Sequence, residues 1–124
     1  MHIPEELKYT KDHEWARIEG DVATVGITDY AQSELGDIVY VELPQIGKKT
    51  KQSESFGTIE AVKAVSDLFA PLSGEIIEVN NTLANQPEII NKDPYGEGWL
   101  VKIKFSNQNE INNLLDKSAY EELI

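Results

Sequence analysis

Residues 57–67 read GTIEAVKAVSD, and the rest of the chain is organised around this stretch. A β-branched, apolar run leads into Lys63 and another leads away from it, as in two strands joined by a tight turn. A second β-rich segment, 75–80, follows a proline and a glycine. Lysine suits a hairpin tip, where its four-carbon stem carries the amine into water. We therefore predict a lysine hairpin at about 53–80, with Lys63 at or near its turn.

Further strands are expected on both sides of this hairpin. Two short β-rich runs separated by Glu-Gly-Asp are typical of a β-hairpin, and a later run alternates apolar and polar residues as a half-buried strand does. The strands do not alternate with long helices, so a parallel sheet is not expected. The predicted strands are 15–18, 22–27, 38–43 and 99–105.

Three helices are expected. A short helix at 30–35 follows Thr28 and Asp29, either of which can cap it, and ends at the next glycine. A second short helix over 88–91 begins at a Gln-Pro pair. The last segment carries an Asn-x-x-Glu capping box and apolar residues at helical spacing, which predicts a C-terminal helix at about 107–123 that packs on the sheet.

Composition limits the class of protein. At 124 residues the chain is long enough for one domain with its own core, and we assign 1–124 to a single domain. The net charge of -11 argues against nucleic acid and against an anionic membrane surface, and it favours electropositive partner sites and a monomer. The absence of cysteine excludes disulfides, thiolate metal sites and a cysteine nucleophile. With no signal peptide and no apolar run long enough for a membrane span, we expect a cytoplasmic protein that is complete from its initiator methionine.

The chain is poorly equipped for catalysis. It has two histidines, no Gly-x-Ser-x-Gly setting and no phosphate-binding glycine loop. Among 22 acidic residues some pair will lie close together, which leaves a glycosidase-like pair open, although a solvating surface is the simpler interpretation. A carrier needs less: one exposed, distinguishable lysine on a rigid turn that a ligase can acylate.

The lysine hairpin, with Glu60 before Lys63 and Asp67 after it, resembles that of lipoyl domains, and most closely that of the glycine cleavage system H proteins. The resemblance covers almost the entire chain. It includes Lys8-Tyr9, His13-Glu14-Trp15, Gly26-Ile27-Thr28-Asp29-Tyr30-Ala31, Leu35-Gly36-Asp37, Val41-Glu42-Leu43-Pro44 and Tyr95-Gly96-Glu97-Gly98-Trp99.

The resemblance implies a fold. Lipoyl and biotinyl domains are sandwiches of two similar half-sheets related by a pseudo-twofold axis. A weak internal repeat, which we call the internal echo, fits that architecture, since residues 35–42 (LGDIVYVE) align with 73–80 (SGEIIEVN) at a constant offset of 38. We expect a mostly β fold with minor α: two small antiparallel sheets with pseudo-twofold halves, short helices and a C-terminal helix.

The resemblance also implies a function in glycine catabolism and one-carbon metabolism. Lipoic acid would be attached covalently to Lys63 by a lipoate ligase or a lipoyl/octanoyl transferase. The arm would receive an aminomethyl group from the pyridoxal-phosphate glycine decarboxylase (P protein) and present it to the tetrahydrofolate-dependent aminomethyltransferase (T protein). Dihydrolipoamide dehydrogenase (L protein) would then reoxidise it. The chain would catalyse nothing itself.

The family rests the loaded arm in a surface cleft, where excluding water slows its hydrolysis. Because the loaded group is a cation, carboxylates should line the cleft, and the matching positions are Glu14 and Asp67. Asp12 lies in the same polar entry, where the family often has a small or hydroxylated residue. We expect His13 to pack next to Trp15.

Several other classes of protein compete with this interpretation. A biotinyl carrier would place methionines beside the lysine, and this chain has valine and alanine there. A lipoyl domain of a 2-oxo acid dehydrogenase complex would be shorter and would continue into a Pro/Ala-rich linker. A lipoyl or octanoyl relay donating to those complexes stays open, as does an unmodified β-sandwich interaction module in which Lys63 is incidental.

Overall fold

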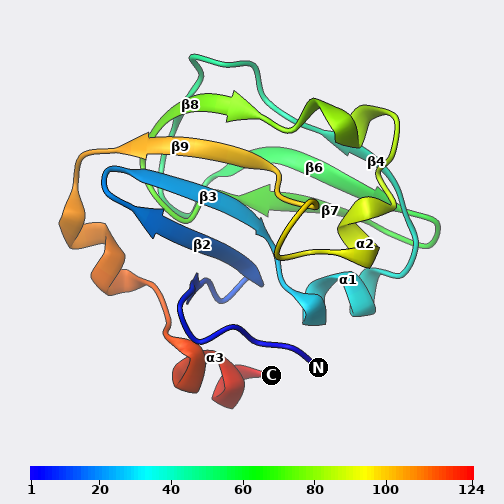
Figure 1. The fold of residues 1–124 in the computed structure, drawn as a ribbon, viewed down its shortest axis with the longest axis horizontal. Helices are drawn as coiled ribbons and strands as arrows, with labels where there is room; N and C mark the ends of the chain where they lie inside the picture. Colours follow the sequence, from blue (N-terminus) through cyan, green and yellow to red (C-terminus); the bar gives the residue numbers. More distant parts are fainter.

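The computed structural model describes all 124 residues and contains two antiparallel sheets with short helices around them (Figure 1). One sheet has six strands and the other has three, which confirms the predicted mostly β class. In sheet order, the first contains β1 (Lys8–Tyr9), β2 (Glu14–Glu19), β3 (Val22–Ile27), β9 (Val101–Phe105), β8 (Gly74–Val79) and β5 (Lys49–Thr50). The second contains β4 (Ile38–Glu42), β6 (Ser55–Ala61) and β7 (Val65–Phe69).

The main core joins both sheets. Ile59 and Leu68 from the three-stranded sheet belong to the same buried cluster as Val25, Ile76 and Ile103 from the six-stranded one. Along β9 the apolar residues are buried and the intervening lysines are not, as the alternating sequence predicted. Each large aliphatic side chain buried in this way contributes about 1.5–3 kcal/mol, so the strand pattern alone strongly favours this packing.

A second cluster anchors the two chain ends. Ile3, Leu7 and Tyr9 near the N-terminus pack with Trp15 and with Tyr120 of the helix α3 (Lys117–Leu123). In Figure 1 the N-terminal segment and α3 lie together beside the β2 end of the larger sheet. No helix of the chain is long and apolar enough to cross a bilayer.

The short helix α1 (Asp29–Leu35) forms where it was predicted. Thr28 provides the cap, because its side chain accepts the N–H of Ala31. Gly36 ends the helix with a φ of 80°, a backbone conformation that residues other than glycine rarely adopt. The second helix, α2 (Ile89–Lys92), starts one residue later than expected. A 3-10 helix, η1 (Asn81–Ala84), was not predicted.

The lysine hairpin is shorter than the predicted 53–80. It closes within β6 and β7, and the segment 75–80 instead forms most of β8, which pairs with β9 and β5 in the other sheet. Gly74 permits this crossing, since a Cβ there would lie 2.2 Å from the Lys104 carbonyl oxygen. The two segments of the internal echo therefore form β4 and β8, one in each sheet.

The predicted continuous helix at about 107–123 is wrong in its extent. The segment forms a 3-10 helix, η2 (Gln108–Asn113), and then α3. Between them Leu115 is extended and exchanges two backbone hydrogen bonds of 2.7 Å with Tyr9. Asn107 caps η2, but Glu110 bonds to Ser73 rather than completing the capping box. Tertiary pairing thus overrides the helical period.

Candidate functional site: a lysine hairpin beside an acidic groove

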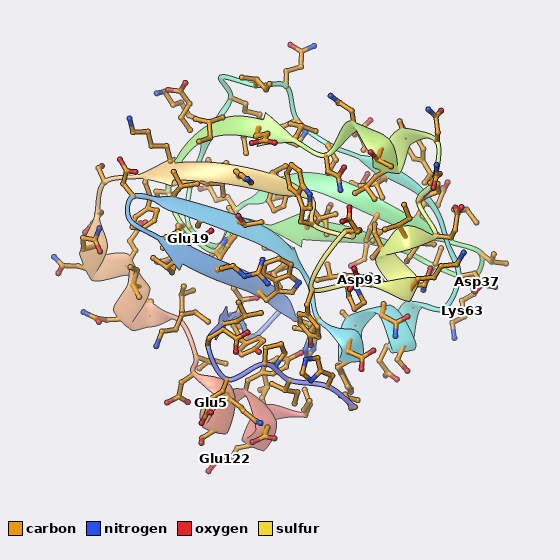
Figure 2. The ribbon with its side chains drawn as sticks, in the orientation of Figure 1. Glu5, Glu19, Asp37, Lys63, Asp93 and Glu122 are labelled. Carbon is orange, nitrogen blue, oxygen red and sulfur yellow. The ribbon has the colours of Figure 1, made fainter.

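Lys63 lies at the tip of the β6–β7 hairpin. The last paired residues are Glu60 and Val65, and the N–H of Ala61 donates to the Ala64 carbonyl at 2.7 Å to close the turn. Lys63 is exposed and forms no ion pair within 4.0 Å. Figure 2 shows its side chain at the rim of the molecule, near Asp37. The amine is therefore accessible, as an acylation site requires.

A groove of about 240 Å³ lies beside this hairpin. Four parts of the chain form it: the turn before β2 and the first residue of that strand, the end of β3, the helix α1, and the strands β6 and β7. The predicted residues Asp12, Glu14 and Asp67 all line it, so the structure brings together carboxylates that are far apart in the sequence. The other lining residues are His13, Ile27, Tyr30, Ala31, Glu34, Leu35, Ile59, Ser66 and Leu68.

Glu14 is the buried member of this acidic set, with 2% of its surface exposed. One carboxylate oxygen accepts the hydroxyl of Thr10 at 2.6 Å, and the other accepts the backbone N–H of Phe69 at 3.2 Å. Burial raises the pKa of Glu14 to about 8, although both hydrogen bonds act in the opposite direction. No cationic side chain pairs with it. The groove therefore holds a carboxyl group that is uncompensated when charged.

Asp12 and Asp67 differ from Glu14 because both are exposed. Asp67 lies on β7, four residues after Lys63, and Asp12 lies in the turn between β1 and β2. Neither forms an ion pair. These two carboxylates line the groove from the solvent side, whereas Glu14 lies within the protein.

The prediction that His13 packs next to Trp15 is wrong. His13 has a φ of 71°, which turns its ring toward Tyr30, with centroids 4.9 Å apart, and its Nδ1 lies 2.9 Å from the Tyr120 hydroxyl. The same hydroxyl lies 2.7 Å from Oγ1 of Thr28. Burial lowers the pKa of His13. Sequence reasoning missed Tyr30, which lines the groove, and also Thr10 and Tyr120, which bond to the lining residues Glu14 and His13. Nothing in their local sequence indicates these contacts.

These features define a class of protein: a two-sheet carrier domain that presents one lysine on an exposed hairpin, with no nucleophile–base pair beside it. The family model described as Glycine cleavage H-protein matches residues 7–124. The chain belongs to the glycine cleavage H-protein family.

Individual relatives agree over the full length. The chain is 56% identical over 124 residues to the "Glycine cleavage system H protein" of Bacteroides thetaiotaomicron, covering 100% of this chain and 98% of that one. It is 55% identical over 120 residues to the protein of the same name from Symbiobacterium thermophilum, covering 97% and 94%. The crystal structure of a glycine cleavage system H protein from Mycobacterium marinum superposes with a TM-score of 0.86 at 42% identity, covering 97% of each chain.

Membership at this level establishes the function as that of the H protein of the glycine cleavage system, a lipoyl carrier that is not itself a catalyst. The family carries its cofactor as lipoyllysine. Membership in the system implies the P, T and L proteins as partners.

Proposed function

We propose that Lys63 is the lysine that carries the lipoyl group, and that the groove lined by Asp12, Glu14 and Asp67 shelters the loaded arm. The observation that carries this proposal is the position of Lys63: an exposed, unpaired amine at the tip of a short hairpin whose second strand forms one wall of the groove.

Position distinguishes Lys63 from most of the ten lysines in the chain. Lys49 pairs with Glu75 at 2.7 Å, and Lys102 and Lys104 lie within 4 Å of carboxylates. Lys11 also occupies a turn between two strands, but β1 is only two residues long. Only the β6–β7 hairpin presents a lysine in a tight turn between two strands of five or more residues, a rigid support for a ligase to recognise.

The groove fits the chemistry of such an arm. When bound, the lipoyl group supplies the disulfide and dithiol chemistry by which an aminomethyl group is carried between the P, T and L proteins. Ile59, Leu35 and Leu68 provide apolar walls for a hydrocarbon chain and exclude water. Asp67 is four residues from Lys63 and therefore at most about 13 Å away, counting about 3.3 Å per extended residue. A lysine stem with a lipoyl chain spans on the order of 10 Å or more, at about 1.5 Å per bond.

The carboxylates of the groove match a cationic load. An ammonium group about 4 Å from a charged Glu14 gains about 4 kcal/mol at an effective dielectric of 20, before desolvation is subtracted. A cation at that position also lowers the pKa of Glu14, because it favours the charged form. Because burial raises its pKa, Glu14 holds its proton to higher pH in the empty groove than an ordinary carboxyl group does, and it becomes a counter-ion when a cation fills the groove.

Further properties belong to this proposal. The lipoyl group is added by a lipoate ligase or a lipoyl/octanoyl transferase. The chain, a single domain over 1–124, acts as a monomer in the cytoplasm. The net charge of -11 supports the monomer through mutual repulsion between copies, and it favours partners with electropositive docking sites.

The test is to compare Lys63→Arg with the matched variant Lys11→Arg, since both lysines are exposed residues in turns. After incubation with a lipoate ligase, intact mass and peptide mapping should show one lipoyl adduct on wild-type protein and on Lys11→Arg, and none on Lys63→Arg. Both variants should stay folded, because arginine keeps the charge and most of the stem. An adduct on Lys48, Lys49 or Lys51, or glycine cleavage supported by Lys63→Arg, would contradict the proposal.

A further inference from the structure

Asn91 of α2 bonds to α1 and to the segment between α1 and β4, which lies beside the lysine hairpin. Its side-chain N–H groups donate to Oε1 of Gln32 in α1 at 3.0 Å and to the Gly36 carbonyl at 2.8 Å. Its side-chain oxygen accepts the backbone N–H of Ile38 at 2.9 Å. The Ile38 N–H can only donate and the Gly36 carbonyl can only accept, so the orientation of the amide is unambiguous. Both donors and the acceptor of Asn91 are therefore used.

The segment 36–38 that Asn91 holds lies directly against the hairpin. The Asp37 carbonyl accepts the N–H of Val62 at 3.1 Å, and Ile38 pairs with Ala61 in the sheet. The backbone of Gly36 lies under the Lys63 stem, because a Cβ built on Gly36 would be 3.5 Å from Cε of Lys63. Figure 2 shows Asp37 and Lys63 at the same rim of the molecule.

The hairpin tip has few restraints of its own. Beyond the last paired residues, the bond between Ala61 and Ala64 closes the turn. The bond from the Val62 N–H to the Asp37 carbonyl is the only backbone hydrogen bond that joins residues 62–64 to the rest of the molecule outside the hairpin. The direction of the tip therefore depends on where segment 36–38 is held.

We propose that Asn91 is a positioning residue for Lys63. By fixing segment 36–38, it keeps the Asp37 carbonyl in place for Val62 and the Gly36 backbone in place beneath the lysine stem. The ligase and the partner enzymes then meet the lysine in one orientation. The inference rests on the proposed role of Lys63 as the attachment site.

The experiment uses Asn91→Asp and Asn91→Leu in the full chain. Aspartate keeps the acceptor for Ile38 but loses both donors, and leucine removes all three bonds without adding charge. In both variants, amide hydrogen exchange at Val62 should be about tenfold faster than in wild-type protein, because segment 36–38 loses part-buried hydrogen bonds that restrain it. The KM of a lipoate ligase for the protein should rise by a similar factor with kcat retained, because a smaller fraction of tips is correctly placed.

Asn80→Asp and Asn80→Leu are the matched controls. The Asn80 side chain also donates two hydrogen bonds, but both go to backbone carbonyls, those of Glu97 and Trp99. The Asn80 variants should lose thermal stability while Val62 exchange and the ligase KM stay unchanged. Unchanged values in folded Asn91 variants, or equal changes in the Asn80 variants, would overturn the inference. Failure of the ligase to modify Lys63 in wild-type protein would overturn the proposed function instead, and the Val62 exchange would still test the role of Asn91.

Discussion

The carboxylate of Glu14 accepts a hydrogen bond from the backbone N–H of Phe69, and this bond joins the two sheets at the groove. Glu14 opens β2 in the six-stranded sheet, and Phe69 ends β7 in the three-stranded one. The hairpin that carries Lys63 is therefore connected through its second strand to the buried carboxyl group of the groove. Changes at Glu14 should affect stability, pH dependence and arm shelter together.

Stability should depend on pH through Glu14. Burial raises the pKa of Glu14 from its ordinary value of 4.5 to about 8. Between these values the unfolded chain has lost this proton and the folded chain keeps it, so the free energy of unfolding falls as pH rises. In Glu14→Gln this fall is absent. The stability of the variant relative to wild type should increase with pH by up to about 1.4 kcal/mol per unit, and level off above about pH 8.

Urea denaturation of both proteins at pH 5, 6, 7 and 8 measures this difference. The difference is needed because His13, whose pKa is lowered by burial, contributes in the opposite direction in both proteins. Glu19→Gln is the control, since Glu19 is an exposed carboxylate at the other end of β2. A Glu14→Gln difference as flat as that of Glu19→Gln would show that Glu14 is ionised throughout the range.

Arm shelter should weaken when the groove loses its buried carboxylate. Glu14→Ala should accept the lipoyl group normally but lose the aminomethyl load about tenfold faster, as expected for the loss of about 1.4 kcal/mol of ground-state stabilisation. Asp67→Asn and Asp12→Asn should have smaller effects, because both carboxylates are exposed. The rate of formaldehyde release from loaded protein measures this, with Glu19→Ala as control. An unchanged rate in Glu14→Ala would show that Glu14 does not protect the loaded arm from hydrolysis.

Gly36→Ala should affect both the fold and the lysine. Gly36 has a φ of 80° and a ψ of -156°, so alanine there should cost about 1–3 kcal/mol of backbone strain. Gly20, with a φ of 64° and open space around it, provides a matched control in a turn remote from the groove. Both variants should lose stability in urea denaturation, but only Gly36→Ala should slow lipoylation of Lys63. Equal lipoylation rates would show that the tip tolerates movement of its support.

Tyr120→Phe should lower the free energy of unfolding, because the Tyr120 hydroxyl bonds to His13 at the groove. The Tyr120 hydroxyl lies within hydrogen-bond distance of His13 and of the helix cap Thr28, and the side chain is fully buried. Removing the hydroxyl takes one hydrogen-bond partner from His13 and one from Thr28, and should cost about 1–3 kcal/mol. Tyr40→Phe, at a tyrosine that is 52% exposed, should be nearly neutral. Comparable losses in the two variants, measured by urea denaturation, would exclude a special role for the Tyr120 hydroxyl.

Much of the fold could be predicted because local patterns decide it. The alternation in β9, the Thr28 cap and the Gly36 stop depend on neighbouring residues alone, and the structure contains all three. The continuous C-terminal helix failed because Leu115 pairs with Tyr9, more than a hundred positions away. The long hairpin failed because the β-rich run after Gly74 pairs with β9 rather than with the lysine strands.

By itself, the sequence determined the class of fold, the family and the choice of Lys63 as the residue to test, because periodicity, turn chemistry and motif spacing are properties of short stretches. The tertiary structure alone decided that Glu14 is buried between two sheets, that its pKa is raised, that His13 contacts Tyr120, and that Asn91 bonds to the Gly36 carbonyl beside the lysine hairpin. The physical reason is that burial and hydrogen-bond partners depend on which distant segments meet in the folded chain. A short stretch of sequence does not show which distant segment it will contact.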